Sequence, residues 1–213
     1  VEMPLSNLAG KRVLEIGSGA GGHSALFARH GAIMTSVDLT HIRAVSTQNK
    51  FRLLGPLAQN CVALQSDAEN LPFADNSFDI VYSNGVLHHT PDTERSLREV
   101  RRVLKPGGQA VIMLYCKSSF HYWFNMWFCT GLLLGKMFGD PNWLGHATEW
   151  GGANKQTVLN PITRCYTAAG IRTLFSQFES ISLRKGEFYF YLIPKLGRLY
   201  RKWQRNRYGE HPG

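Results

Sequence analysis

The chain has 213 residues, of which 44% are hydrophobic and 18% are charged, and its formal net charge is +9. This length and composition exclude a disordered chain and predict one ordered domain, residues 1–213, with a buried core. The four cysteines form no CxxC pair and lie at no metal-ligand spacing from a histidine. We therefore expect reduced thiols, no metal site and a cytoplasmic location.

The basic character, with an isoelectric point near 9.6, suggests three classes of ligand. Nucleic acid, an anionic membrane surface or an acidic substrate could each account for it, and a merely soluble basic surface is the equal alternative. Val1–Gly10 lacks a basic segment followed by an apolar stretch, so no signal peptide is expected there. The apolar run Tyr122–Leu134 is shorter than the roughly 20 residues that cross a bilayer.

Short apolar runs alternate with helical patterns along the first half of the chain. Strands are expected at Lys11–Gly17, Ile33–Asp38, Cys61–Asp67, Phe78–Asn84 and Gln109–Tyr115. Helices are expected at His23–His30, from a cap at Thr40 to Leu54, and at Thr90–Leu104 before the stop Pro106-Gly107-Gly108. This alternation predicts an α/β fold: a Rossmann-like, doubly wound, mainly parallel sheet with helices on both faces.

The alternation of strand and helix patterns ends after Tyr115. Residues 117–161 are rich in aromatics and glycine, and we interpret them as a lid inserted over the carboxyl edge of the sheet, where ligands bind in such folds. A helix is expected near Thr167–Phe178, followed by a strand within Ser180–Tyr191. The tail Lys195–Arg207 has a helical pattern with six basic residues and no acid.

A glycine-rich loop follows the first predicted strand. Gly17, Gly19 and Gly22 satisfy the GxGxxG pattern, so a nicotinamide-binding fold is one interpretation. Asp38 ends the second strand 21 residues after Gly17, where a carboxylate can accept hydrogen bonds from both hydroxyls of a ribose. The alternative is that Asp38 caps the next helix. The pair predicts a ligand that contains adenosine, without selecting the chemistry.

Four blocks of sequence, in order and spacing, carry a family resemblance. They are VLEIGSGAGG at Val13–Gly22, VDLT at Val37–Thr40, SDAENLPFADNSFDIVYSNGVLHHTPD at Ser66–Asp92 and LREVRRVLKPGGQAVIMLY at Leu97–Tyr115. Over Lys11–Tyr115, half of the chain, the sequence resembles class I S-adenosylmethionine-dependent methyltransferases, especially those acting on small molecules such as quinone precursors. A dehydrogenase would have no reason to carry the last two blocks. The resemblance implies a seven-strand sheet, although the sequence does not locate the last strand.

The resemblance also implies S-adenosylmethionine as cofactor, S-adenosylhomocysteine as product, and a role for particular residues. The implied cofactor-binding residues are Glu15, Gly17, Ser18, Gly19, Gly21, Asp38, Leu39, Asp67, Ala68, Asn84 and Gly85. The glycines would line the methionine part of the cofactor, and Glu15 would orient their loop. Asp38 would hold the ribose, with Leu39 against the adenine. Asp67 and the following backbone N–H would bind the adenine edge, and backbone carbonyls at Asn84 and the next glycine would face the amino group.

Two adjacent histidines are the catalytic candidates. His88 and His89 follow the fourth strand, and an imidazole titrates near neutral pH, so either could deprotonate a methyl acceptor. Of the two, we expect His89 to face the site. The alternative is structural: one histidine packs against the helix after Pro91 and the other faces solvent.

The acceptor is expected to be a small hydrophobic or aromatic molecule. Residues 120–138 hold seven aromatic side chains that suit either a substrate lid or ordinary core. Together with 195–207 they could also give peripheral membrane contact, and a solvated basic face is the alternative for the tail. Asn84-Gly85-Val86-Leu87 stands where base-methylating enzymes carry Asn/Asp-Pro-Pro-aromatic, which argues against nucleic acid.

Two other functional classes stay open. A non-catalytic relative would bind the cofactor without turnover, and an oxidoreductase would bind a nicotinamide cofactor instead. Two features depart from the family pattern: ten residues precede Lys11, where helices usually close over the cofactor, and no partner is found for the strand within Ser180–Tyr191. The sequence predicts no oligomeric state.

Overall fold

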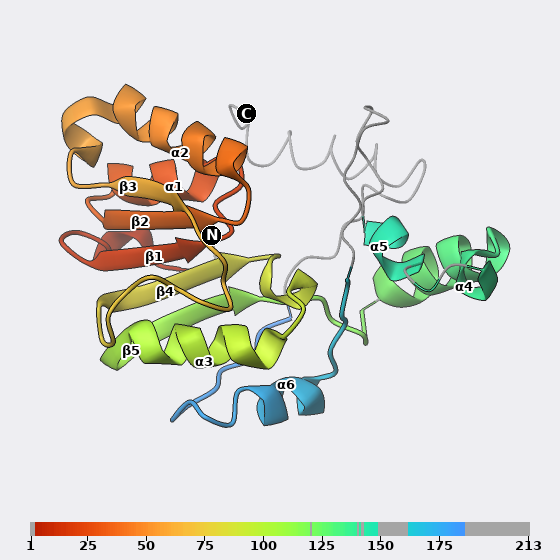
Figure 1. Cartoon of the computed structure of the whole chain (residues 1–213). Coiled ribbons are helices and arrows are strands. Elements are labelled where there is room, and N and C mark those ends of the chain that lie inside the picture. Colours follow the sequence, from red (N-terminus) through yellow and green to blue (C-terminus); the bar gives the residue numbers. More distant parts are fainter. Residues whose placement is uncertain (1–2, 120, 140, 142, 149–161, 186–213) are drawn as a thin grey trace, which may run out of the picture.

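A parallel sheet forms the centre of the molecule (Figure 1). The computed structural model describes residues 3–119, 121–139, 141, 143–148 and 162–185. Its strands are β1 (Arg12–Ile16), β2 (Ile33–Asp38), β3 (Val62–Gln65), β4 (Phe78–Asn84) and β5 (Leu104–Met113). They pair in the order β3-β2-β1-β4-β5, and every pairing is parallel. The predicted α/β class is confirmed. Because the order reverses between β1 and β4, the carboxyl ends of these strands flank the position where such sheets bind ligands.

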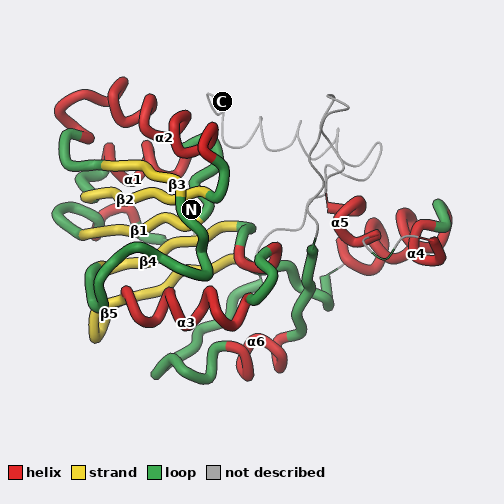
Figure 2. Tube along the Cα trace, viewed as in Figure 1, coloured by secondary structure: helices red, strands yellow, loops and turns green. Residues whose placement is uncertain are grey.

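Helices cover both faces of this sheet (Figure 2). The helices are α1 (Gly22–Arg29), α2 (His41–Leu54), α3 (Thr93–Val103) and α6 (Ala168–Leu174), with short 3-10 helices η1 (Leu5–Asn7) and η2 (Gly55–Ala58). α1 and α2 cover one face, and α3 covers the other with α6 beside it (Figure 1). A doubly wound arrangement follows, as the alternation of strands and helices predicted.

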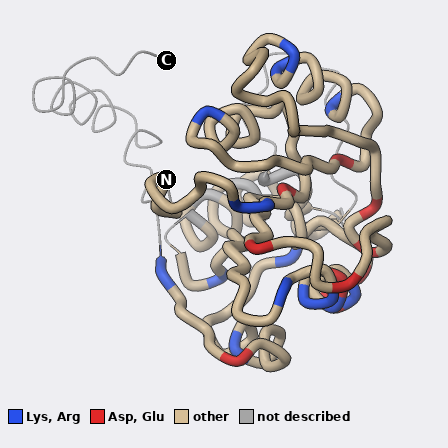
Figure 3. Tube along the Cα trace, turned by 90° about the vertical axis from the view of Figure 1, so that its left-hand side faces the viewer, with Lys and Arg blue, Asp and Glu red and all other residues tan. Residues whose placement is uncertain are grey.

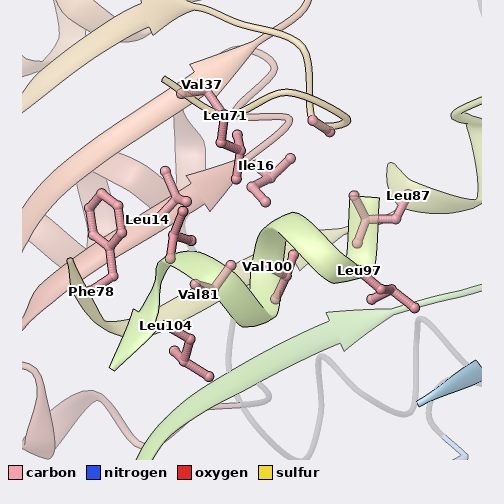
Figure 4. Close-up of a cluster of buried hydrophobic side chains, with 12 residues drawn as sticks. Leu14, Ile16, Val37, Leu71, Phe78, Val81, Leu87, Leu97, Val100 and Leu104 are labelled. Atoms are coloured by element: carbon pink, nitrogen blue, oxygen red, sulfur yellow. The ribbon is translucent and has the colours of Figure 1, made fainter. Parts of the chain in front are cut away.

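The core lies between α3 and the sheet (Figure 4). Leu97 and Val100 of α3 are fully buried and belong to one cluster with Leu14, Ile16 and Val81 from the strands. Each such side chain stabilises the fold by roughly 1.5–3 kcal/mol relative to an exposed one. A second cluster closes the opposite face and includes Val13, Phe27, Met34, Phe51, Ile80 and Tyr82. Residues on β1 alternate between the two clusters, as the period of a strand requires.

The starts of α3 and β5 differ clearly from the predictions. α3 begins at Thr93 instead of Thr90, because the Asp92 side chain caps it by accepting a 2.9 Å hydrogen bond from the Arg95 backbone N–H. β5 begins at Leu104, so the predicted stop at Pro106–Gly108 lies inside the strand, at a shift in its register with β4. Thr40 is the residue before α2, but its side chain makes no capping bond.

The second half of the chain departs from the βα pattern, as expected. The described part of the insertion is helical: a π-helix η4 (His121–Leu133), α4 (Lys136–Gly139) and α5 (Trp143–Thr148). These helices lie beyond the edge to which the strand arrows point (Figure 1). Tyr122 and Met126 are buried there in a small cluster with Tyr115 and Trp143. None of the described helices is both long and apolar enough to pass through a membrane.

The remaining predictions concern the end of the chain. α6 confirms the helix expected near Thr167–Phe178, and the Thr167 side chain accepts a hydrogen bond from the Gly170 N–H at its start. Residues 180–185 contain no strand, so the first part of the strand expected within Ser180–Tyr191 is not observed. The rest of that strand, the tail Lys195–Arg207 and residues 149–161 lie outside the described residues.

Candidate functional site

The glycine loop after β1 has three residues in the left-handed backbone region. The φ angles of Gly17, Gly19 and Gly21 are 78°, 55° and 77°. A Cβ atom on Gly17 would lie 2.1 Å from Cγ2 of Val86, and one on Gly21 would lie 2.9 Å from Cα of Thr47. A Cβ atom on Gly19 would meet nothing within 4 Å. Packing therefore requires the outer two glycines, whereas the middle one borders open space that a ligand can approach.

Asp38, at the carboxyl end of β2, is joined to this loop. Its Oδ2 atom accepts a 2.9 Å hydrogen bond from the Gly19 N–H. Its Oδ1 atom accepts from the backbone N–H of Thr40 at 3.0 Å and from the Thr40 hydroxyl at 2.9 Å. α2 begins only at His41, so these bonds order the approach to the helix and do not cap its first turn. Each carboxylate oxygen can accept two hydrogen bonds, so Oδ2 retains capacity for a ligand hydroxyl.

Glu15 acts on the loop from below. The side chain is only 2% exposed and accepts a hydrogen bond from the Ser24 hydroxyl in the first turn of α1. The Ser24 oxygen also lies 2.7 Å from the Ser36 hydroxyl on β2. Nδ1 of His23 lies 3.7 Å from Oε1 of Glu15. The carboxylate thus links β1 to the helix on the other side of the loop, which suits an orienting role.

The residues expected to bind adenine lie at the adjacent strand ends. Leu39 is exposed beside Asp38, and its carbonyl accepts a 2.9 Å hydrogen bond from Nε2 of Gln65 at the end of β3. Asp67 is exposed, and its Oδ1 accepts from the Glu69 N–H at 2.9 Å. Ala68 is buried in the core. An exposed apolar side chain at strand ends that also carry carboxylates is a suitable surface for a flat heterocycle with polar edges.

The end of β4 completes this edge of the sheet. The Asn84 side chain donates a 3.2 Å hydrogen bond to the Tyr82 hydroxyl, and the Gly85 N–H donates to the Met113 carbonyl at 3.3 Å. Gly85 has a φ of 74°, a conformation that glycine adopts without strain. The structure therefore brings the predicted cofactor residues to the carboxyl ends of four neighbouring strands. Ser18, in the glycine loop, is buried and accepts a 3.0 Å hydrogen bond from Thr47.

The two histidines lie on the 3-10 helix η3 (Leu87–His89) just after this edge. His88 is 0% exposed, and its ring centroid lies 4.1 Å from that of His89 and 4.0 Å from that of Tyr115. Neither of its ring nitrogens has a hydrogen-bond partner among the residues that the structure describes. Burial, aided by the charge of His89, lowers the pKa of His88 to about 3. His88 is therefore neutral at physiological pH and a weak base.

His89 is half-buried and has a defined tautomer. Its Nδ1 atom lies 2.9 Å from the carbonyl oxygen of Ile162 and 3.2 Å from the Thr163 hydroxyl. A carbonyl oxygen can only accept, so Nδ1 carries the proton and donates it to Ile162. In that tautomer the lone pair is on Nε2, which is the atom that can take up a proton.

The segment that holds His89 was not predicted from the sequence. Arg164 donates from its backbone to the His88 carbonyl at 3.0 Å and from its guanidinium to the carbonyls of Thr90 and Pro91 at 2.5 and 2.8 Å. Tyr166 donates from its hydroxyl to Thr93 at 3.0 Å. More than 70 residues separate these partners, so no short-range sequence pattern could predict the contact.

Two other kinds of site find no support in the described part of the chain. There, no cluster of three or more His, Cys, Asp or Glu side chains could hold a metal ion. All four cysteines are free and half-buried. Burial raises the pKa of Cys165 to about 11, so this thiol is protonated at neutral pH and is a poor nucleophile.

Comparison with known proteins identifies the segment that carries this geometry. Residues 14–112 match the family described as "Methyltransferase domain". This match assigns residues 14–112 to the methyltransferase domain family. It contains the predicted cofactor residues and both histidines. The return segment at 162–166 lies outside it, which is a further reason why the family pattern did not reveal the partners of His89.

The methyltransferase domain has curated relatives and a recognisable fold. It is 36% identical over 114 residues to the ubiquinone/menaquinone biosynthesis C-methyltransferase UbiE of Haemophilus ducreyi, covering 52% of this chain and 44% of that protein. It is 42% identical over 103 residues to phthiotriol/phenolphthiotriol dimycocerosates methyltransferase 1 of Mycobacterium ulcerans, covering 47% and 36%. The chain thus spans less than half the length of these relatives. The YcgJ structure from Bacillus subtilis shares the fold, with a TM-score of 0.58 and 24% identity over 81% of this chain and 63% of that one.

Proposed function

We propose that this protein transfers a methyl group from S-adenosylmethionine to a small hydrophobic acceptor. The observation that carries the proposal is the 2.9 Å bond between the Gly19 N–H and Asp38, at the strand ends of a methyltransferase domain. A glycine loop tied to a carboxylate at that position suits a ligand with a ribose and a charged amino-acid part. The two curated relatives are named for methylation of a quinone and of a dimycocerosate, which supports a small-molecule acceptor.

The residues at this edge fit the cofactor in chemical type. When bound, S-adenosylmethionine supplies a methyl group on a positively charged sulfur. Asp38 would accept from a ribose hydroxyl through Oδ2, and Leu39 would cover one face of the adenine. The backbone beside Gly19 would border the methionine part, since no atom lies within 4 Å of its Cβ position. Glu15 would keep the loop in place through Ser24, without contact with the cofactor.

His89 is the group that we propose as a base for acceptors that must lose a proton. The Ile162 carbonyl fixes its ring and leaves the lone pair on Nε2. His88 packs against it as a neutral ring, because burial lowers the pKa of His88 to about 3. Positioning the acceptor and excluding water would supply the rest of the rate enhancement, since methyl transfer is an in-line displacement.

The acceptor would bind against the insertion. η4, α4 and α5 lie beyond the carboxyl edge of the sheet (Figure 1), and Tyr115 joins them to the histidines: its ring contacts His88 and packs with the cluster of Tyr122 and Met126. Apolar walls with a few polar groups are typical of small-molecule sites. This arrangement supports an acceptor with an extended apolar part and an acidic O–H, N–H or C–H group near His89.

Two measurements on the full chain test the proposal. Calorimetry should detect S-adenosylhomocysteine binding, and NADH should show none. Transfer of a labelled methyl group into a fractionated cell extract should then place label in the organic-soluble fraction. Label found only in nucleic acid or protein would contradict the acceptor class. Binding without any labelled product would favour the non-catalytic alternative.

A further inference from the structure

We propose that the exposed side of η4 and α4 is a docking surface for an anionic lipid bilayer. The two helices and the turn between them carry large apolar side chains that are exposed. We call these side chains the apolar patch; they include Trp123, Phe124, Phe128, Leu133, Leu134 and Phe138. Phe138 is 76% exposed, and Leu133 and Leu134 are each 65% exposed.

The exposed side of η4 differs from the solvent-facing side of an ordinary amphipathic helix. The opposite side of η4 is also apolar, since Tyr122 and Met126 are buried against Tyr115 and Trp143. A helix that only covers a core keeps charged residues on its outer side. η4 instead exposes large aromatic and aliphatic groups close together, which is the pattern of an interaction surface.

Charge identifies the partner as anionic. The sequence contains no acidic residue between Glu99 and Asp140. Two exposed lysines lie in this stretch: Lys136 stands between Leu134 and Phe138 of the patch, and Lys117 precedes η4 in the sequence. Basic and acidic residues are mixed from Asp92 to Arg102, whereas the stretch between Asp38 and Asp67 also carries only basic charges. Figure 3 shows where the charged residues of the described part lie. The sequence 195–207, which lies outside the described residues, also holds six basic residues and no acid. Aromatic and leucine side chains, in the stretch 117–139 whose only charges are lysines, favour the interface of a membrane that carries negative headgroups.

The position of the patch also agrees with the proposed acceptor. The same insertion lies beyond the strand ends that carry the cofactor residues (Figure 1), so contact with a bilayer would bring the site close to molecules dissolved in it. This last step rests on the proposed function. Membrane binding itself does not, because it can be measured without turnover.

Sedimentation of the full chain with vesicles tests the surface. Wild-type protein should bind phosphatidylcholine vesicles that contain phosphatidylglycerol. Its binding to pure phosphatidylcholine vesicles should be much weaker, and so should its binding to the mixed vesicles at high salt concentration. The double variant Leu133→Ser/Leu134→Ser should bind these vesicles at least about tenfold more weakly than wild type. The matched control Leu53→Ser/Leu57→Ser removes two exposed leucines well away from α4 and should bind like wild type.

Circular dichroism and thermal melting should show that both double variants fold, and Phe138→Ser gives a second, single change within the patch. Equal binding of the Leu133/Leu134 variant and wild type would overturn the proposal. So would equal loss of binding by the control variant. A concentration-dependent dimer that the patch variant abolishes, with no vesicle binding by wild type, would instead assign the surface to a second copy of the chain.

Discussion

The backbone N–H of Gly19 donates a 2.9 Å hydrogen bond to the carboxylate of Asp38. This bond joins the loop after β1 to the end of β2, so the two parts expected to hold opposite ends of the cofactor are coupled. Thr40 holds the other carboxylate oxygen. A change at Asp38 should therefore affect both a ligand contact and the order of the loop.

Asp38→Asn tests this coupling. The amide keeps the shape of the side chain but loses one acceptor oxygen and the negative charge. We expect S-adenosylhomocysteine to bind about 2 kcal/mol more weakly by calorimetry, as for the loss of hydrogen bonds to a charged group. Asp75→Asn is the control, since Asp75 is exposed and pairs with Arg102 away from the site. Unchanged affinity of the Asp38 variant would contradict the assigned cofactor site.

The glycine loop separates packing from ligand approach. Gly19→Ala should cost roughly 1–2 kcal/mol of stability for its left-handed backbone and should also weaken cofactor binding, because the new methyl group enters the open space. Gly10→Ala is the control: φ is 72° and its Cβ position is also open, but it lies before β1. It should lose similar stability and keep its affinity. Equal cofactor affinities of the two variants would show that the cofactor does not bind next to Gly19.

Gly21→Ala should behave differently. Its Cβ atom would lie 2.9 Å from the Thr47 backbone, where no side-chain motion can relieve the clash. We expect a larger loss of stability than for Gly10→Ala or Gly19→Ala, measured by denaturant unfolding. A stability equal to that of Gly19→Ala would show that α2 can shift away from the loop at little cost.

His88 predicts a dependence of stability on pH. Its pKa is about 3 in the folded chain and 6.5 in an ordinary setting, so the stability it contributes is full above pH 6.5 and is lost as the pH falls toward 3. Between pH 7 and pH 5 this histidine should account for a loss of about 2 kcal/mol in the free energy of unfolding. Over the same pH range, the free energy of unfolding of His88→Phe should fall by about 2 kcal/mol less than that of wild type. The exposed-site control His30→Phe should keep the wild-type slope, and a wild-type slope in both variants would mean that His88 takes up protons when folded.

His89→Gln tests the proposed base. Loss of a general base lowers kcat typically by about 100-fold or more, whereas S-adenosylhomocysteine affinity should stay unchanged. Ile162 acts through its carbonyl, so no side-chain change removes that contact. Its neighbour Thr163→Val keeps the shape and removes the hydroxyl near Nδ1. We expect Thr163→Val to retain most of the activity. Full activity of His89→Gln would leave the histidine pair with a packing role.

Much of the fold could be predicted because its signals are local. β2 and β4 have the predicted bounds, α2 follows Thr40 and ends at Leu54 as predicted, and α1 differs by one residue at each end. These elements were predictable because apolar periodicity and glycine stops lie within each segment. The predicted apolar face of α3 is the buried one. The start of β5 was predicted too late in the chain, because Pro106-Gly107-Gly108 indicates a turn. The sheet accommodates these residues at a change of register that depends on β4.

The site was predictable in part for the same reason. The loop glycines and Asp38 belong to contiguous motifs, and parallel strands bring their ends together. The environment of the histidines was not predictable, because it depends on Ile162 and Arg164, which return to η3 after the insertion. Nor could spacing show that His88 is sealed from solvent while its neighbour is half-exposed, since both follow the same strand.

The two ends of the insertion are fastened to each other. The Tyr166 N–H donates to the Tyr115 carbonyl, and the Lys117 N–H donates to the Tyr166 carbonyl, each at 2.8 Å. Extra residues between such fixed ends add little to the free energy of closing the loop. We therefore expect that the insertion can be lengthened or replaced at a small cost in stability, because the sheet and the glycine loop keep their own supports.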